Sequence, residues 1–216
     1  MRIRLSLLLA AVLTLLAVGV AAAAVNRGLP LRAKWLDDPN HETGTEVPGA
    51  FVVQQRGYYS ITAQMHLKQL TPGHRYTLWW VAYNDPSACT DGCGVDELAA
   101  VAATGENPTG IGVYFGGSYV VTATGKLDVG TRILEFSVNG CQSGGPYAIC
   151  DVLRDAAVAE AMILVNDQGP ATGAPLAPAS AAFSDGCKSY SQGGVVVATF
   201  GDTGYDCYTA QTVFLP

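Results

Sequence analysis

The chain has 216 residues, 14% of which are charged, and a formal net charge of −6 at pH 7. An acidic surface repels polyanions, so this composition argues against nucleic acid and anionic membranes as partners. About 190 residues follow the N-terminal segment described next, enough for one domain with a hydrophobic core.

Residues 1–24 have the three parts of a secretory signal peptide. Arg2 and Arg4 precede an uncharged apolar run that ends near Val25, and Ala21–Ala24 are small residues of the kind that signal peptidase accepts. We predict cleavage and a secreted chain, extracellular or periplasmic, with ten basic and eighteen acidic residues. Because the run is close to the ~20 residues of a membrane span, an uncleaved N-terminal anchor is the alternative. We expect no membrane contact after cleavage.

The first half of the mature chain contains the clearest strand patterns. Residues 25–46 are polar and aperiodic, which predicts a linker or N-terminal arm with Trp35 tucked against the body. Residues 51–55 form a predicted strand, and residues 59–67 alternate between apolar and polar side chains, the period of a half-buried strand. Residues 76–83 are apolar on both faces, which is typical of a central strand.

The second half is predicted to continue as short strands, with one single domain over residues 47–216. A loop at 84–94 is followed by a hairpin around Thr124-Gly125. Further strands are predicted at 119–123, 126–129, 132–138, 159–165, 193–201 and 211–216, and a short helix at 151–158. Turn signals about every ten residues predict an all-β fold, an antiparallel Greek-key sandwich or jelly roll with at most one short helix.

Six cysteines in an exported chain predict a disulfide-stabilised fold. Sequential pairing, Cys89 with Cys93, Cys141 with Cys150 and Cys187 with Cys207, is the simplest of the 15 connectivities, which the sequence leaves open. Zinc is the competing interpretation. The chain has no C-x-x-C pair and no histidine at ligand spacing, so we predict no zinc site.

The stretch CQSGGPYAIC, residues 141–150, resembles the nucleophile loop of trypsin-like proteases. That family places Asp-Gly before the serine, whereas Cys141 and Gln142 precede Ser143 here, and neither His66 nor His74 lies beside a cysteine. A serine nucleophile also needs a base and an orienting carboxylate within reach. We therefore interpret the stretch as a turn closed by a disulfide and predict no catalytic residue.

Two further chemistries can be drawn from the acidic residues. Asp85, Asp91, Asp96 and Glu97 surround the first cysteine loop, where oxygen ligands suit calcium, although their spacing matches no EF-hand. Glycoside hydrolysis needs two carboxylates roughly 5 to 10 Å apart, for which Glu97, Glu135 and Asp151 are the candidates. Solvated surface acids are the simpler interpretation of both sets, so we predict no metal and no cofactor.

Three resemblances to known families bear on the fold. Leu70-Thr71-Pro72-Gly73-His74-Arg75-Tyr76 resembles the tyrosine corner of fibronectin type III and Ig-like domains, which implies that the Tyr76 hydroxyl bonds upstream backbone. The motifs YTLWWVAYNDPSAC, GGSYVVTATGKLDVG and AEAMILVNDQGP together resemble exported microbial β-rich proteins without an established activity. LTPGH before a strand is similar to copper/zinc superoxide dismutases, but Leu78 and Trp80 stand where that family has metal-binding histidines.

We expect a secreted, non-enzymatic protein with a binding or surface role, whose partner is a glycan or a protein. The loops around Cys89–Cys93 and Cys141–Cys150 would present the contact surface. Trp79, Trp80 and Tyr83 are candidates for ligand contact, together with the neighbouring aromatic pair Tyr58 and Tyr59. The alternative is a secreted hydrolase whose site assembles from distant loops, which a histidine–carboxylate or carboxylate–carboxylate pair in a cleft would favour.

Overall fold

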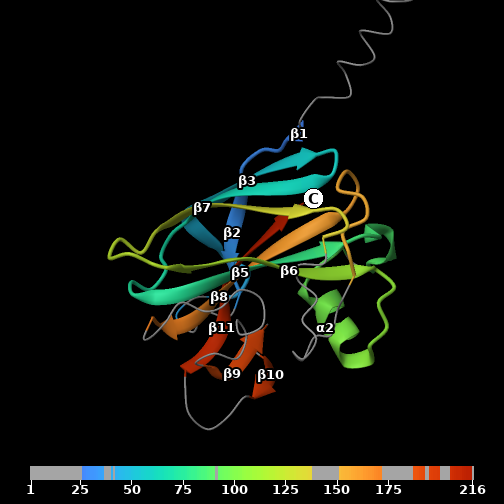
Figure 1. Ribbon diagram of the computed structural model, residues 1–216. Helices are drawn as coiled ribbons and strands as arrows, with labels where there is room; N and C mark the ends of the chain where they lie inside the picture. The colour runs from blue at the N-terminus through green and yellow to red at the C-terminus, as the bar shows by residue number, and fades with distance from the viewer. Residues whose placement is uncertain are drawn as a thin grey trace, which may run out of the picture.

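The computed structural model describes residues 26–36, 40, 42–90, 92–137, 151–171, 187–192, 195–199 and 205–215. Within these ranges the protein is mostly antiparallel β-sheet, with one α-helix and one short 3-10 helix (Figure 1). The prediction of an all-β fold with at most one short helix is confirmed at this level.

The elements are distributed along the whole described chain. In chain order they are β1 (Asn26–Arg27), β2 (Leu31–Trp35), β3 (Glu46–Gly57), β4 (Ser60–Leu67), β5 (His74–Tyr83), η1 (Pro86–Ala88), α2 (Val95–Thr104), β6 (Ile111–Val120), β7 (Leu127–Leu134), β8 (Glu160–Pro170), β9 (Cys187–Gln192), β10 (Val195–Thr199) and β11 (Tyr205–Leu215).

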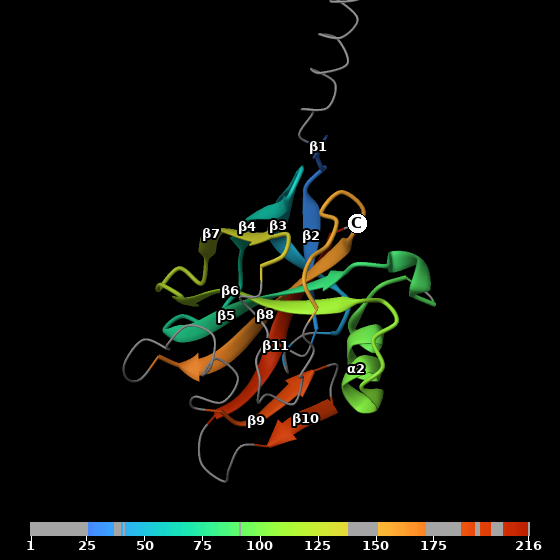
Figure 2. The same cartoon turned by 45° about the vertical axis from the view of Figure 1, so that its right-hand side comes forward.

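Eight strands form a continuous series in the order β6-β5-β8-β11-β2-β3-β4-β7. Every neighbouring pair in this series is antiparallel. β1 adds to β3, and the β9–β10 hairpin joins β11 through a parallel contact of β9. Figure 2 shows β9 and β10 at the end of the molecule opposite β1.

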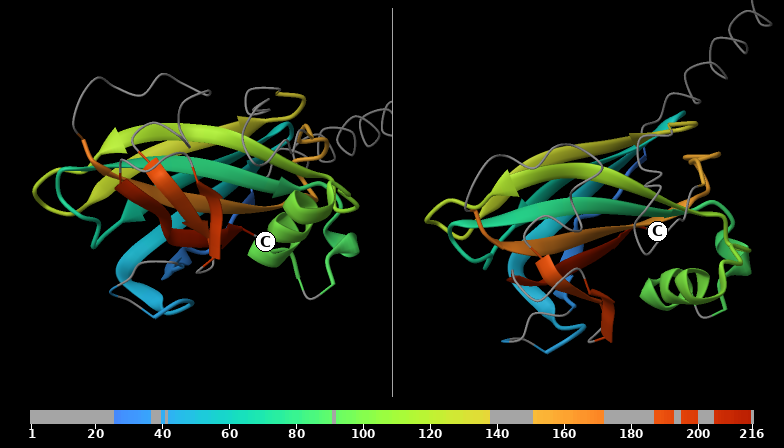
Figure 3. Two further views of the ribbon diagram at one scale, coloured as in Figure 1. Left: turned by 90° about the horizontal axis from the view of Figure 1, so that it is seen from below. Right: turned by 60° about the horizontal axis from the view of Figure 1, so that its bottom comes forward.

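The sheet nearly closes because its two edge strands, β6 and β7, approach each other (Figure 3). Thr131 of β7 makes the contact: its hydroxyl donates to the Gly116 carbonyl of β6 at 3.0 Å and accepts from the Trp80 indole at 2.9 Å. A Cβ atom at position 116 would lie 2.9 Å from the Thr131 hydroxyl. Glycine at this position therefore permits the close approach of the two edges.

The alternating pattern of β4 supplies part of the core inside the sheet. Ile61, Ala63, Met65 and Leu67 are at most 1% exposed, as their period-two spacing predicted. They belong to the same buried cluster as Trp80 from β5. β5 lies between β6 and β8, which confirms that the strand with two apolar faces is central.

The outer face of β5 is covered by α2, an element that the sequence did not predict. The helix begins after Gly94 and ends before Gly105, whose φ of 74° is the left-handed conformation that favours glycine at a helix end. Leu98 and Val101 are buried against Trp79 and other side chains of the sheet. The two faces of β5 thus carry two separate apolar clusters.

The predicted helix at 151–158 is wrong. These residues form an irregular segment with a turn. Side chains of other elements bind its backbone: the Asn84 amide donates to the Val152 carbonyl at 2.8 Å, and the Arg56 guanidinium donates to the Ala156 carbonyl at 2.7 Å. The tertiary hydrogen bonds replace the helical ones that local propensity favoured.

The predicted hairpin at Thr124-Gly125 is also wrong. β6 pairs with β5 and β7 pairs with β4, and no described ladder joins β6 to β7. The turn between them docks on another loop, where the Leu70 N–H donates to the Gly125 carbonyl at 3.1 Å. The short connection therefore links the two edges of the nearly closed sheet.

The predicted arm at 25–46 contains a strand of the main sheet. β2 lies between β11 and β3. Along it, the exposed Arg32 and Lys34 alternate with the buried Ala33 and Trp35. The arm prediction is wrong for this strand, whereas the burial of Trp35 is confirmed. The strand has only five residues, two of them charged and exposed, so its alternation of buried and exposed side chains is too short to identify a strand from the sequence.

Two local predictions concern the Tyr76 corner and the cysteines. The Thr71 N–H donates to the Tyr76 hydroxyl at 3.0 Å, so the predicted bond to upstream backbone is present. Cys89 and Cys93 form a disulfide. Cys141 and Cys150 lie outside the described residues. The side chains of Cys187 and Cys207 also lie outside them, although their strands, β9 and β11, are neighbours. Both pairings stay predictions.

Among the described helices, none has the length and apolar character of a membrane span.

Candidate functional site

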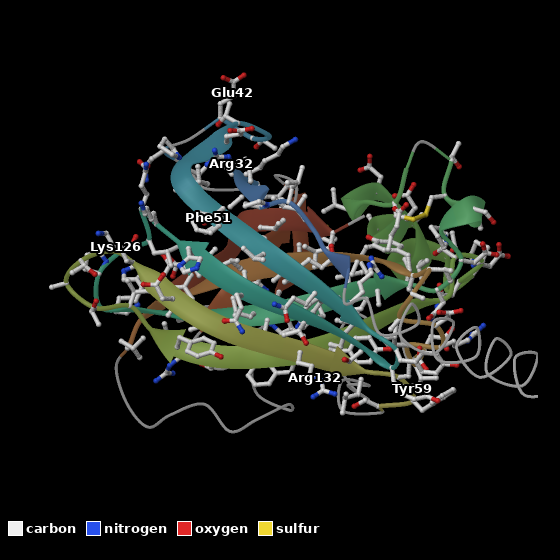
Figure 4. All side chains as sticks on the ribbon, turned by 90° about the horizontal axis from the view of Figure 1, so that it is seen from above. Arg32, Glu42, Phe51, Tyr59, Lys126 and Arg132 are labelled. Atoms are coloured by element: carbon white, nitrogen blue, oxygen red, sulfur yellow. A yellow bond between two sulfur atoms is a disulfide. The ribbon has the colours of Figure 1, made fainter. Side chains whose placement is uncertain are left out.

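A groove of about 810 Å³ lies between α2 and the disulfide-closed loop that precedes it. Its described wall is formed by Ala88 of η1, Thr90, residues 92–94, one side of α2, and Glu106, Pro108 and Thr109. Figure 4 shows the disulfide, drawn in yellow, beside the ribbon of α2. This concavity on the outer side of β5 is the candidate ligand site.

The rim of the groove is fixed to the end of β5 by hydrogen bonds. The Tyr83 hydroxyl donates to the Gly94 carbonyl at 2.5 Å, immediately before α2. On the other side, the Asp85 N–H donates to the Thr109 carbonyl at 3.0 Å, and the Asn84 amide donates to the Gly110 carbonyl at 2.7 Å. Both walls therefore rest on consecutive residues of one chain segment, which gives the groove a rigid base.

Tyr83 remains a neutral donor in this position. Burial raises the pKa of its hydroxyl well above the usual value, and the negative charges of Glu97 and Glu160 raise that pKa further. A protonated hydroxyl is what the hydrogen bond to Gly94 requires, so the rim contact is present throughout the neutral pH range.

The groove carries one sign of charge. Asp96, Glu97 and Glu106 line it, and among the described lining residues there is no lysine, arginine or histidine. Glu97 accepts a hydrogen bond from the Gly94 N–H at 2.8 Å and is held there, whereas Asp96 and Glu106 are exposed. Carboxylates in the first turn of a helix are stabilised by its dipole. The exposed carboxylates of Asp96 and Glu106, rather than the helix terminus, are the groups that would attract positive charge.

The remaining wall is apolar with a few hydroxyl groups. Thr109 is 3% exposed, and its hydroxyl has no hydrogen-bond partner among the described residues. Ala88, Val95, Ala100 and Pro108 supply apolar surface. This combination of apolar lining and few polar groups is common in ligand-binding concavities.

The four acidic residues considered as calcium ligands are only partly brought together. Asp96 and Glu97 line the groove, Asp85 accepts from the Ser87 hydroxyl at 2.5 Å, and Asp91 lies outside the described residues. Within the described ranges, no group of three or more metal-ligating side chains is close enough to hold an ion.

A buried histidine–carboxylate pair lies elsewhere, between the start of β5 and β8. His74 Nδ1 is 3.0 Å from both carboxylate oxygens of Asp167, which is fully buried. Asp167 also accepts from the Tyr76 hydroxyl at 2.8 Å and from the Gly169 N–H at 2.7 Å. Burial first, and then the Asp167 charge, raise the pKa of Tyr76, so this hydroxyl stays protonated and is a poor nucleophile.

The other candidate acids and bases are engaged in structural contacts. Glu135 accepts from the Ala156 N–H at 2.6 Å, and Asp151 forms an ion pair with Arg154. His66 lies 2.7 Å from Asp128 on the exposed surface. Ser143 and His41 lie outside the described residues.

The aromatic contact residues predicted from the sequence are in the core. Trp79 and Trp80 are 0% exposed and Tyr83 is 1% exposed, so these three side chains offer no surface to a ligand. The side chains of Trp79 and Trp80 point to opposite faces of β5. One of them would be exposed only if one face of the strand were open to solvent, but α2 covers the face that carries Trp79. Tyr58 and Tyr59 are exposed, at the turn between β3 and β4.

The groove residues that the sequence reasoning missed are in α2 and the following loop, chiefly Thr104, Glu106 and Thr109. A helix signal was available: Asp96 and Glu97 at its start, Leu98 and Val101 three positions apart, and Gly105 at its end. No sequence signal pairs residues 106–109 with the cysteine loop, because that contact depends on the end of β5.

Comparisons of the chain with protein-family models, with curated proteins and with solved structures found no match. The geometry of the site is therefore the basis for the functional proposal that follows.

Proposed function

We propose that the chain is an exported, non-enzymatic binding protein whose groove beside α2 takes a cationic segment of a protein partner, a lysine- or arginine-containing peptide. The observation that carries the proposal is the groove itself, about 810 Å³ in volume, whose described wall residues include three carboxylates and no basic side chain. A volume of this order is typical of small-ligand sites, and short peptide side chains fit within it.

The scaffold supports such a role. The groove is formed by loops and a helix on a packed sheet, an arrangement in which binding residues are commonly found. The Cys89–Cys93 disulfide fits the oxidising compartment to which the N-terminal segment would send the chain. Export, the other two disulfides and a Greek-key classification of the strand order belong to this proposal.

Electrostatics sets the expected strength of binding. An ammonium or guanidinium group in the groove is attracted by two or three carboxylates together, although water and salt screen the exposed Asp96 and Glu106. Bidentate contact of a guanidinium with a carboxylate is stronger than a lysine contact, so we expect arginine peptides to bind more tightly than lysine peptides. Affinity should fall as salt is added.

The test is calorimetric titration of the exported chain with tetra-arginine, tetra-lysine and tetra-glutamate peptides. We expect binding of the two basic peptides and none of the acidic one. The double variant Asp96→Asn/Glu106→Gln should weaken arginine-peptide binding at least tenfold. The control Glu42→Gln/Asp128→Asn removes the same charge from exposed positions outside the groove and should bind like the parent. Equal losses in both variants, or no binding of any basic peptide, would refute the proposal.

The His74–Asp167 pair is the observation that favours the alternative, a secreted hydrolase. It satisfies the requirement for an oriented imidazole, and a hydroxyl nucleophile would have to come from another part of the chain. Turnover of simple ester or glycoside substrates that is abolished by His74→Ala would favour this function. Glycan-array binding without peptide binding would assign the groove, or another surface, to a carbohydrate.

A further inference from the structure

One end of the molecule collects most of the exposed large apolar side chains. Seven such side chains occur among the described residues, and five of them lie here: Tyr58, Tyr59, Leu134, Phe136 and Val158, with exposed fractions of 78, 61, 44, 68 and 59%. We name this surface the aromatic end. Single exposed apolar residues are ordinary, whereas a concentration of them marks a contact surface.

Backbone contacts show that these residues are neighbours. Leu134 is in register with Ser60, next to Tyr59, and the Glu135 N–H donates to the Tyr59 carbonyl at 2.9 Å. The Tyr58 and Tyr59 rings are in edge contact with centroids 4.4 Å apart. Figure 4 shows Tyr59 at one end of this face of the sheet, with Lys126 at the other.

The turn that carries Val158 reaches the same end through Arg56. The Arg56 guanidinium donates to the carbonyls of Ala156 and Ala159 at 2.7 and 2.6 Å, and Arg56 is two residues before Tyr58. The turn that contains Val158 is therefore held at the end of β3 that leads to the two tyrosines.

Phe136 occupies a conformation that is unfavourable for its residue type. Its φ is +57°, and its N–H donates to the Leu153 carbonyl at 2.9 Å. A bulky side chain with a positive φ is strained, and glycine or asparagine would be accommodated more easily. Exposure at 68% means that packing within the described chain contributes little to offset this strain. An exposed, strained aromatic residue is consistent with a contact that lies outside the chain.

The N-terminal segment joins the body at the aromatic end. Asn26 pairs with Arg56 of β3, and the apolar run of the sequence ends at about Val25. A residue spans at most ~3.5 Å, so the body cannot move far from a bilayer that holds the apolar run. Phe136 follows β7, which is two strands from β3 in the sheet, a separation of roughly 10 Å. The aromatic end therefore extends beyond the point where the N-terminal segment joins the body.

We propose that, in the uncleaved form of the chain that is the alternative to a cleaved signal peptide, the aromatic end rests on the phospholipid surface while the N-terminal apolar segment is inserted in the bilayer. Tyrosine side chains are favoured at the membrane–water interface, where their rings contact lipid and their hydroxyls remain hydrated. The five side chains of the aromatic end are uncharged, so zwitterionic lipid is the expected surface.

The test uses the full chain, residues 1–216, reconstituted in phosphatidylcholine vesicles with and without brominated acyl chains, which quench tryptophan at lipid depth. The probe is Phe136→Trp, and the matched control is Val120→Trp, at the opposite end of the sheet and 52% exposed. The native tryptophans are buried and contribute a constant background. We expect bromolipid to quench Phe136→Trp at least twofold more than the parent chain and Val120→Trp no more than the parent.

A second variant separates contact from simple tethering. Tyr58→Ser/Tyr59→Ser, added to Phe136→Trp, should halve the extra quenching if aromatic contact holds this end on the lipid. Where Phe136→Trp does not fold, Tyr59→Trp serves as the probe and Phe136→Gly as the loosening change. Equal quenching at positions 136 and 120, or no effect of loosening, would overturn the proposal. Quenching that is absent while light scattering reports a dimer would assign the aromatic end to a second copy of the chain.

Discussion

The groove beside α2 and the aromatic end differ in shape, charge and mode of support. The groove is concave, acidic and braced by a disulfide, and its hydroxyl and carboxylate groups sit on a rigid base at the end of β5. The aromatic end is formed by turns, carries no charge among its five exposed side chains, and includes a strained phenylalanine.

The two regions nevertheless share one structural element, the irregular segment at residues 151–159. Asn84, beside the groove, binds the Val152 carbonyl, and Phe136, in the aromatic end, binds the Leu153 carbonyl. A scaffold can thus offer two surfaces with different partner chemistry while depending on common packing. Changes to the shared part should damage both regions, and changes to the local parts should damage only one.

Alkaline pH should have the largest effect, because it acts on buried tyrosines that support both regions. Burial is the main cause that raises the pKa of Tyr76, Tyr83 and Tyr114 above the usual value of about 10. Below that value both folded and unfolded chains are protonated, so stability is fully present; above it only the unfolded chain loses protons, and stability falls as pH rises toward the folded pKa. By pH 11 the three groups together should lower the free energy of unfolding by about 4 kcal/mol.

Urea unfolding between pH 8 and pH 11 measures this effect. Tyr114→Phe, which removes one titrating group and its bond to the Asp151 carbonyl, should reduce the decline by about a third while lowering stability at pH 8. A free energy of unfolding that stays constant from pH 9 to pH 11 would contradict the assignment of these hydroxyls as buried donors.

Leu153→Ala should break both regions through their shared segment. Leu153 is fully buried in the main core cluster, and its loss leaves a cavity that should cost about 3 kcal/mol. Chemical denaturation gives the stability, with Val120→Ala, at an exposed position, expected within about 0.5 kcal/mol of the parent. A Leu153→Ala chain as stable as the control would show that the segment is not a packed part of the core.

Cys89→Ser/Cys93→Ser should separate the regions. Loss of a disulfide over so short a loop should cost about 2 kcal/mol and loosen one wall of the groove. We expect arginine-peptide affinity to fall and the bromolipid quenching at position 136 to stay as in the parent. Loss of both properties at a temperature where the variant is folded would show that the regions are coupled.

The sequence predicted the parts of the fold that have long or uninterrupted patterns. β4 alternates over eight residues, and residues 76–83 of β5 are apolar except for Thr77; both were predicted as strands. β2 was missed because five residues with two outward charges give too little alternation to distinguish a strand from a linker.

The candidate site was harder to predict because it depends on contacts between distant segments. The cysteine loop, predicted to present a contact surface, contributes Cys93 and Gly94 to the wall of the groove, and its contact with a partner stays a prediction. The opposite wall, residues 106–109, is positioned by hydrogen bonds to Asn84 and Asp85, which no local pattern reveals. Trp79 and Trp80 were predicted as ligand contacts, but Trp80 faces the main core and α2 covers Trp79 on the other side of β5, which no local pattern indicated.

Phe136→Gly should have the smallest effect on stability and the opposite sign. Relief of the positive φ should raise the free energy of unfolding by about 1 kcal/mol, because little packing is lost from an exposed side chain. Gln69→Gly, at the other non-glycine position with positive φ in the described chain, is the matched control and should gain a similar amount. With Tyr59→Trp as probe, only Phe136→Gly should reduce quenching by bromolipid. A marked loss of stability in Phe136→Gly would show that the ring packs within the protein.

The most direct test of the central claim is to map the arginine-peptide contact on the isotope-labelled chain by amide chemical-shift changes. The groove predicts that the largest changes fall on Gly92, Gly94, Glu106 and Thr109, which line it, and that Tyr58, Tyr59 and Phe136 show none. Changes centred on the aromatic end, or spread evenly over exposed acidic residues, would contradict the assignment of the groove as the binding site.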